Sequence, residues 1–282
     1  MSGRTLVGFA GARIDVVRLD TGATALADFL FRQFPSGAAA APCLRLDLAE
    51  DGPSTFSLWR NGAPVYRHTP AAKAARLLLA EAIHHLAMAC CDGIVFHAAA
   101  VVASENRGIL LPGCSGAGKS TLAAWSDHRG FPCLGDEMIA VAEGGARLIA
   151  FPRPICLQTD ARDVLPEIVE QARRDGRLLE AEDAILLAPR TPVPSTPVAL
   201  ACIVFPRYDA RATATLQPLS RAESGLRLMG SLVSAHGAPE HGFHAVADLA
   251  RRVPAFELSY GRLDGIAETL LSEASSSTGS SR

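Results

Sequence analysis

The sequence contains very little lysine. Of its 282 residues only Lys73 and Lys119 are lysines, and the rest of its 27 basic residues are arginines. An excess of positive charge is also missing, because the formal net charge is −2. Proteins whose main partner is nucleic acid or an anionic membrane surface usually carry a strongly basic region. We therefore expect neither partner.

Paired cysteine motifs and long apolar runs are missing as well. The seven cysteines are an odd number and show no paired C-x-x-C spacing, which argues against a disulfide framework and against a zinc site. The chain does not open with a basic segment followed by an apolar one, and no uncharged apolar run reaches about 18 residues. These absences predict a soluble, cytoplasmic protein.

The strongest positive signal is one glycine-rich stretch. It reads Gly113-Cys114-Ser115-Gly116-Ala117-Gly118-Lys119-Ser120, is followed by Thr121, and fits G-x-x-x-x-G-K-[ST] at every fixed position. The apolar run 108–112 before it predicts a buried strand, and the segment 119–127 after it predicts a short helix. We call residues 113–120 the glycine-rich loop.

This loop predicts a nucleotide site that extends from Gly113 to Thr121. Glycines let successive backbone N–H groups surround phosphate oxygens, and the N-terminus of the following helix adds partial positive charge. In such a site Lys119 bridges the β- and γ-phosphates and the Ser120 hydroxyl holds Mg²⁺. The alternative is a degenerate loop that binds nothing.

The rest of the pattern predicts an α/β protein in three parts. Residues 1–70 are expected to form a small α+β subdomain with a helix over 24–34, a strand over 44–48 and a hairpin around Asn61-Gly62. Residues 71–271 form the main domain and begin with a long helix over 71–91, and the serine-rich segment 272–282 reads as a disordered tail. Further strands are expected over 94–102, 130–134, 138–142, 148–151, 198–205 and 256–260, and further helices over 160–182, 221–233 and 242–252.

An acidic pair, Asp136 and Glu137, follows the loop after about one helix and one strand. Carboxylates at the end of a neighbouring strand can face Mg²⁺ and the γ-phosphate. One can orient the metal while the other accepts the proton of an attacking hydroxyl. The later strand 202–205 ends in Pro206-Arg207 without a carboxylate, so it supplies no such acid. The alternative interpretation is a solvated turn that happens to carry two acids.

Three further side chains are candidates for the site. His97 lies in the middle of the apolar run 94–102, where it could reach the transferred phosphoryl group or orient an acid; a hydrogen-bonded core histidine is the alternative. Arg153 and Arg207 follow the apolar residues Phe151 and Phe205. An arginine at a strand end can contact phosphate oxygens or substrate, and a surface salt bridge is its alternative role.

Together these residues resemble a known family. His97, the glycine-rich loop and Gly135-Asp136-Glu137 resemble the catalytic domain of HPr kinase/phosphorylase, and the chain is most similar to the HPr-kinase-related group called HprK-related kinase A. The matches to that group continue through residues 151–155, 204–208 and 218–223, and cover most of the chain from about 75 to 270. The resemblance to true HPr kinase is limited to residues 97–137.

The resemblance implies a P-loop domain with a mixed sheet, like that of HPr kinase and phosphoenolpyruvate carboxykinase. It further implies that Mg²⁺-ATP phosphorylates a serine-type hydroxyl of a peptide or small protein. The implied catalytic residues are His97, Lys119, Asp136 and Glu137, and Ser120, Asp136 and Glu137 are the implied metal ligands.

The chain departs from the parent family in two places. Glu137 replaces the second aspartate of the family's acidic pair, and Thr121 replaces the acidic residue after the loop serine. The family assembles into ring-like oligomers, which makes a homo-oligomer one of the assemblies to consider. Two other functions stay open at this point: a nucleotide-binding regulatory or assembly protein without kinase turnover, and a kinase acting on the hydroxyl of a small molecule.

Overall fold

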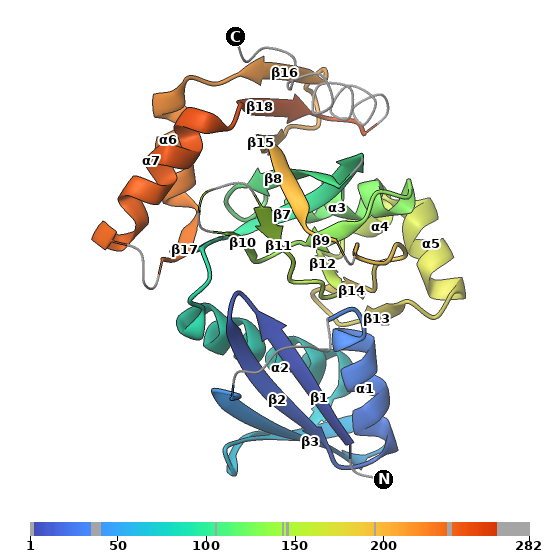
Figure 1. Cartoon of the computed structure of the whole chain (residues 1–282). Coiled ribbons are helices and arrows are strands. Elements are labelled where there is room, and N and C mark those ends of the chain that lie inside the picture. Colours follow the sequence, from blue (N-terminus) through green and yellow to red (C-terminus); the bar gives the residue numbers. More distant parts are fainter. Residues whose placement is uncertain are drawn as a thin grey trace.

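The computed structural model describes residues 3–34, 41–104, 106–142, 144, 147–194, 196–235 and 239–263. The expected tail, 272–282, lies outside these residues. Within them the chain is a mixed α/β protein with three sheets and seven α-helices (Figure 1). The same residues include no helix that is both long and apolar enough to cross a membrane.

The first sheet is formed by the N-terminal strands in chain order. It contains β1 (Gly3–Phe9), β2 (Ala12–Arg18), β3 (Leu44–Gly52), β4 (Thr55–Arg60) and β5 (Ala63–Pro70). All neighbours are antiparallel except β2 and β3, which are parallel and joined through α1 (Thr21–Phe31). The predicted hairpin between β4 and β5 is confirmed, since Arg60 pairs with Ala63 and both turn residues, Asn61 and Gly62, have positive φ.

Two helices cover one face of this sheet. The Asp20 carboxyl begins α1 by accepting a hydrogen bond from the Ala23 N–H at 2.7 Å. The second helix, α2 (Ala71–Ala89), buries Leu78 and Leu86 in the same apolar core as the inward side chains of the strands. The boundary that the sequence predicts after residue 70 therefore separates the first sheet from α2, although α2 packs on that sheet.

The second sheet is the largest. Its main path runs through β17 (Leu232–Ser234), β6 (Ile94–Phe96), β10 (Ile139–Val141), β11 (Arg147–Ile149), β15 (Val198–Tyr208), β8 (Arg107–Pro112), β7 (Ala98–Ser104) and β9 (Cys133–Gly135). The long strand β15 connects its parts. The first half of β15 pairs with β11 and β8, and its second half pairs in parallel with β18 (Ala255–Tyr260), which also pairs with β16 (Thr215–Pro218).

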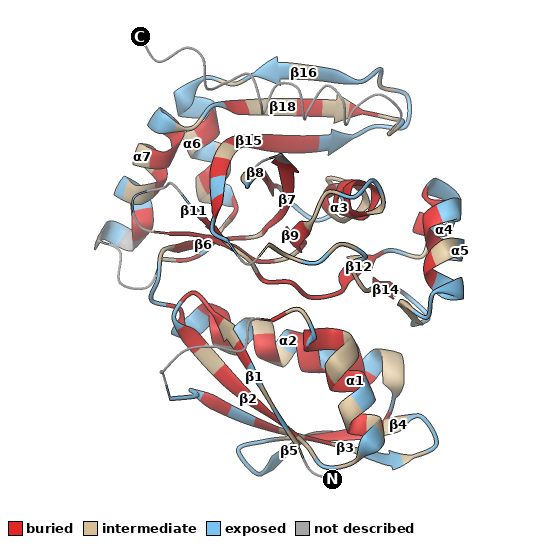
Figure 2. Cartoon of the chain, turned by 45° about the vertical axis from the view of Figure 1, so that its right-hand side comes forward, coloured by how far each residue is buried: buried red, intermediate tan, exposed pale blue. Residues whose placement is uncertain are grey.

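Both faces of the large sheet are covered (Figure 2). Side chains along its strands alternate between two cores. On β7, Ala99 and Val101 belong to one core, whereas Ala98, Ala100 and Val102 belong to the other. The first core also contains side chains of α3 (Lys119–His128) and α5 (Pro166–Arg174). The second contains those of α6 (Arg221–Gly230) and α7 (Phe243–Arg252).

The third sheet is small and packs beside α3. It consists of β12 (Ile155–Leu157), β14 (Ile185–Leu187) and β13 (Leu178–Glu180), and the short helix α4 (Ala161–Val164) precedes α5. Ile155 and Leu157 of β12 and Ile185 and Leu187 of β14 belong to the same core as α3, whereas Leu186 belongs to the core of the first sheet.

Three segments differ from the expected elements. The run 94–102 forms two strands, because β6 pairs with β10 and β17 while β7 pairs with β8 and β9, and the chain changes partners at His97. The segment 160–182 ends in the strand β13 instead of continuing as helix. The segment 221–233 ends in β17, where Leu232 pairs with Phe96. Leu232 pairs with a residue far away in the sequence, whereas β13 pairs with the strand that follows it, β14 (Ile185–Leu187).

The packing of α2 yields a first prediction. Leu78 is fully buried, whereas the adjacent Leu77 is 37% exposed. We expect Leu78→Ala to lower the free energy of unfolding by about 2–5 kcal/mol because it leaves a cavity. The matched Leu77→Ala should change it by no more than about 0.5 kcal/mol. Urea unfolding of the two variants checks this, and equal losses would contradict the packing of α2 on the N-terminal sheet.

Candidate functional site

The sequence-predicted loop, acidic pair and histidine line one cavity of about 350 Å³. The glycine-rich loop joins β8 to α3, the acidic pair follows β9, and His97 lies between β6 and β7. The lining residues among the candidates are His97, Ser115, Gly116, Gly118, Lys119, Ser120, Thr121, Asp136 and Glu137. Strand pairing within one sheet therefore brings together residues that are up to 40 positions apart in the sequence.

The backbone of the glycine-rich loop has features that suit an anion. Gly116 and Gly118 have φ values of +81° and +93°, a region that L side chains rarely adopt. Among the described residues, the backbone N–H groups of Gly116, Gly118 and Lys119 have no hydrogen-bond acceptor. Unpaired N–H groups at a helix N-terminus attract phosphate oxygens. This arrangement fits the phosphates of a nucleotide.

The Lys119 side chain folds back over the loop. Its Nζ donates hydrogen bonds to the carbonyl oxygens of Gly113 at 2.7 Å and Cys114 at 2.9 Å. Burial lowers the pKa of Lys119, and the nearby carboxylates of Glu137 and Asp136 oppose that decrease. The ammonium thus holds the two ends of the loop together at the wall of the cavity.

A tyrosine that the sequence analysis missed holds the loop from the other side. The Tyr260 hydroxyl at the end of β18 donates a 3.0 Å hydrogen bond to the carbonyl oxygen of Gly118. A Cβ at Gly118 would lie 2.1 Å from this hydroxyl, so the close approach requires glycine. The only sequence signal was indirect: Tyr208 and Tyr260, which end β15 and β18, are two of the three tyrosines in the chain.

The acidic pair is held by Arg153. Nη2 of Arg153 lies 2.8 Å from Oδ1 of Asp136 and 3.2 Å from Oε2 of Glu137. Asp136 is only 1% exposed, and its Oδ2 accepts a 2.8 Å hydrogen bond from the Cys156 N–H. Burial raises the pKa of the Asp136 carboxyl, and the Arg153 guanidinium and the Cys156 N–H oppose that rise.

Glu137 faces the cavity and contacts the histidine. Its side chain is 41% exposed, and its Oε1 lies 3.4 Å from Nε2 of His97. Burial and the positive charge of Lys119 lower the pKa of His97, which favours the neutral imidazole near pH 7. The backbone fixes both residues, because the Ala98 N–H donates to the carbonyl oxygen of Glu137. His97 is therefore placed to orient Glu137.

The two candidate arginines lie in different surroundings. Arg153 is 4% exposed, and its guanidinium contacts the acidic pair from the protein interior. Arg207 is exposed near the end of β15, and the cavity is lined by its neighbour Tyr208 instead. Neither arginine lines the cavity.

The residues of the cavity could hold a metal ion only together with a nucleotide that supplies further oxygen ligands. In the part of the chain that the structure describes, no group of three or more His, Cys, Asp or Glu side chains could hold a metal ion. Mg²⁺ bound with a nucleotide takes one or two carboxylates and completes its shell with phosphate oxygens and water. Ser120 interacts with the Asp136 carboxyl, so a hydroxyl and a carboxylate stand together beside the loop.

The N-terminal part of the chain also reaches this cavity. Arg76 of α2 and Asp183, which precedes β14, both line it and form an ion pair with each other. Sequence reasoning did not find either residue, since an arginine on a polar helix face and an aspartate in a loop are ordinary surface features.

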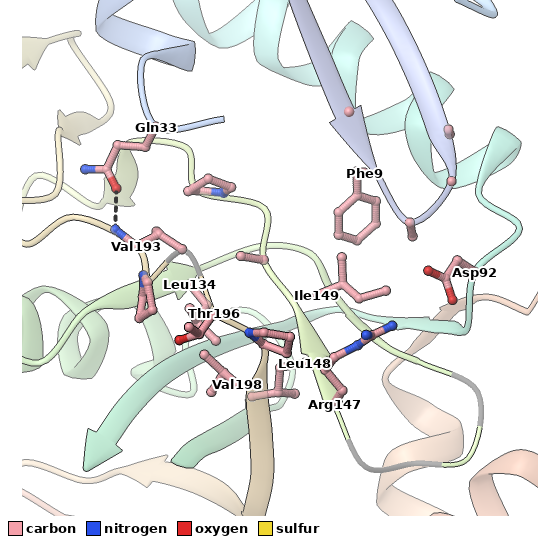
Figure 3. A pocket seen from close by; sticks show the side chains of 18 of the residues that line it. Phe9, Gln33, Asp92, Leu134, Arg147, Leu148, Ile149, Val193, Thr196 and Val198 are labelled. Atoms are coloured by element: carbon pink, nitrogen blue, oxygen red, sulfur yellow. Dashed lines mark hydrogen bonds between the residues drawn. The ribbon is translucent and has the colours of Figure 1, made fainter. Parts of the chain in front are cut away.

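A second cavity, of about 590 Å³, lies between the N-terminal sheet and the large sheet (Figure 3). Its lining comes from the β1–β2 hairpin, from β11 and from residues 193, 194 and 196–198, with Phe9 and Ile149 among its apolar side chains. Gln33 closes one side by accepting a hydrogen bond from the Val193 N–H. None of the candidate site residues lines this cavity, so the cavity at the glycine-rich loop is the candidate site.

Comparison with known proteins adds no assignment to this geometry. The chain matches no protein-family model, and no curated protein sequence matches it significantly. The resemblance to the HPr-kinase-related group therefore stays a prediction, and the interpretation of the site depends on its own residues.

The contact between Tyr260 and the loop can be tested with two glycines. Gly118 and Gly130 have nearly equal φ values of +93° and +91°, but a Cβ at Gly130 meets nothing within 4 Å. We expect Gly130→Ala to cost about 1–2 kcal/mol of stability from its backbone conformation alone. Gly118→Ala should cost more, because its methyl group meets the Tyr260 hydroxyl. Equal losses in urea unfolding would contradict this contact.

The buried arginine can be tested in the same way. Arg153→Met leaves the buried Asp136 carboxyl without its countercharge, and we expect the free energy of unfolding to fall by about 3–5 kcal/mol. The control is Arg207→Met, which removes an exposed guanidinium and should change stability by no more than about 0.5 kcal/mol. Guanidinium chloride unfolding measures both variants. A similar, small effect for both would show that Arg153 does not support the acidic pair.

Proposed function

We propose that this protein is an ATP-dependent kinase that transfers the γ-phosphoryl group to a serine-type hydroxyl of a peptide or small protein. The observation that carries the proposal is the meeting of three groups in one cavity: the glycine-rich loop with Lys119, the acidic pair, and His97. The proposal includes a P-loop domain like that of HPr kinase for residues 71–271.

The proposed roles follow from the contacts of each residue. The loop N–H groups and Lys119 bind the phosphates, and Ser120 with Asp136 holds Mg²⁺. Bound Mg²⁺ supplies charge neutralisation on the phosphate oxygens. Glu137 accepts the proton of the acceptor hydroxyl, because it is the exposed member of the pair, whereas the Asp136 side chain is buried. His97 orients Glu137 from one side and Arg153 from the other.

The division between the two acids supports a kinase over a binding protein. The Asp136 side chain is buried and ion-paired with Arg153, whereas Glu137 is accessible from the cavity. A general base must reach the proton that it removes. A protein that only binds nucleotide needs no accessible base beside the phosphates.

Phosphoryl transfer is tested with γ-labelled ATP and Mg²⁺. The acceptors are serine-containing peptides and small proteins, and free serine represents a small-molecule acceptor. We expect label on a peptide or protein. We expect Lys119→Ala to reduce the rate by about 10²–10³-fold, because the variant lacks the fixed positive charge that stabilises the phosphates. Lys73→Ala, which removes the only other lysine, should leave the rate unchanged.

Glu137→Gln separates turnover from binding. We expect this variant to bind Mg²⁺-ATP with nearly the affinity of the wild type and to transfer phosphate about 10²–10⁴-fold more slowly, the usual contribution of a general base. Labelling of free serine alone would change the function to small-molecule phosphorylation. The proposal would be contradicted if, for every acceptor tested, the wild type turned over ATP no faster than Lys119→Ala.

A further inference from the structure

A third cavity, of about 830 Å³, adjoins the candidate site. It lies between α3, the segment from Asp163 to Ile168, and the end of β18. Tyr208 and Val164 line both this cavity and the one that contains Lys119 and the acidic pair. A ligand whose phosphates occupy the glycine-rich loop can therefore extend past these two residues without crossing the protein.

The order of the strands indicates which end of such a ligand points toward the third cavity. The acidic pair follows β9, two strands from β8 on one side of the sheet, whereas β15 and then β18 lie on the opposite side of β8. The reacting phosphate must face the acidic pair. The rest of a nucleoside triphosphate then extends toward the ends of β15 and β18, where Tyr208 and Tyr260 stand.

The Tyr208 ring is available and is fixed relative to the loop. It is 42% exposed, and its centroid lies 5.7 Å from that of Tyr260 in an edge-to-face arrangement. Tyr260 in turn is hydrogen-bonded to Gly118. A half-exposed aromatic ring beside a phosphate site is a surface on which a nucleobase can stack, since every base presents a π face.

We propose that the purine base of the bound nucleoside triphosphate stacks on Tyr208 and occupies this third cavity. This inference rests on the proposed function, because it takes the phosphates to lie on the glycine-rich loop. Trp125 of α3 lines the same cavity, with the Arg129 guanidinium 5.2 Å from its ring centroid. A base in the cavity therefore lies near the Trp125 indole, whose fluorescence can report its binding.

The first test compares two ligands that share the triphosphate, of which only one carries a nucleoside. The probes are Mg²⁺-ATP and inorganic tripolyphosphate with Mg²⁺, titrated into the full chain by calorimetry. We expect Tyr208→Ala to weaken ATP binding by about 5- to 150-fold, the effect of losing one base–aromatic stack, and to change tripolyphosphate binding by less than twofold. Tyr208→Phe should keep wild-type affinity for both ligands. Phe243→Ala, which removes another exposed ring on α7, is the matched control.

The second test does not depend on a variant at Tyr208. The chain has two tryptophans, so Trp59→Phe leaves Trp125 as the only indole. Mg²⁺-ATP should then quench the Trp125 emission, and tripolyphosphate should bind without quenching.

The outcomes separate this inference from the proposed function. ATP affinity that stays within twofold in Tyr208→Ala, or an equal loss for both ligands, overturns the base site and leaves the loop as a phosphate site. ATP binding that leaves the Trp125 emission unchanged also overturns it. If the wild type binds neither ligand, the proposed function and the base site fail together.

Discussion

Arg153 holds the buried carboxyl of Asp136 at an ion-pair distance of 2.8 Å, and the geometry of the candidate site depends on this contact. An unpaired charge in a protein interior is very costly, whereas a paired and hydrogen-bonded one can be accommodated. The pair joins the end of β9 to the connector between β11 and β12. The same guanidinium also reaches Glu137, so one buried cation sets the position of both acids.

The loop opposite the acids is held at several points. Lys119 ties it to the carbonyl oxygens of Gly113 and Cys114, and Tyr260 ties it to the sheet through Gly118. The N–H groups of Gly116, Gly118 and Lys119, which line the cavity, have no acceptor among the described residues. Donors that are fixed before the ligand arrives need little reorganisation on binding, and this gives such a site its electrostatic strength.

Local signals made much of this structure predictable. The glycine-rich loop, the hairpin at Asn61-Gly62 and the α1 and α3 helices follow from short patterns with direct physical causes. Long-range pairing was not predictable, because it depends on partners far away in the sequence. The strand break at His97, the burial of Arg153 against the acids and the contact of Tyr260 with Gly118 belong to this class.

The claim that the loop N–H groups bind phosphate is tested most directly by amide hydrogen exchange across residues 113–121, with and without Mg²⁺-ATP. The N–H groups of Gly116, Gly118 and Lys119 have no acceptor among the described residues, so we expect fast exchange there and strong protection when the nucleotide binds. The three-residue strand β13, which is remote from the loop in sequence and lines no part of the cavity, should show little change. Exchange in the loop that is equally fast with saturating Mg²⁺-ATP would contradict the account.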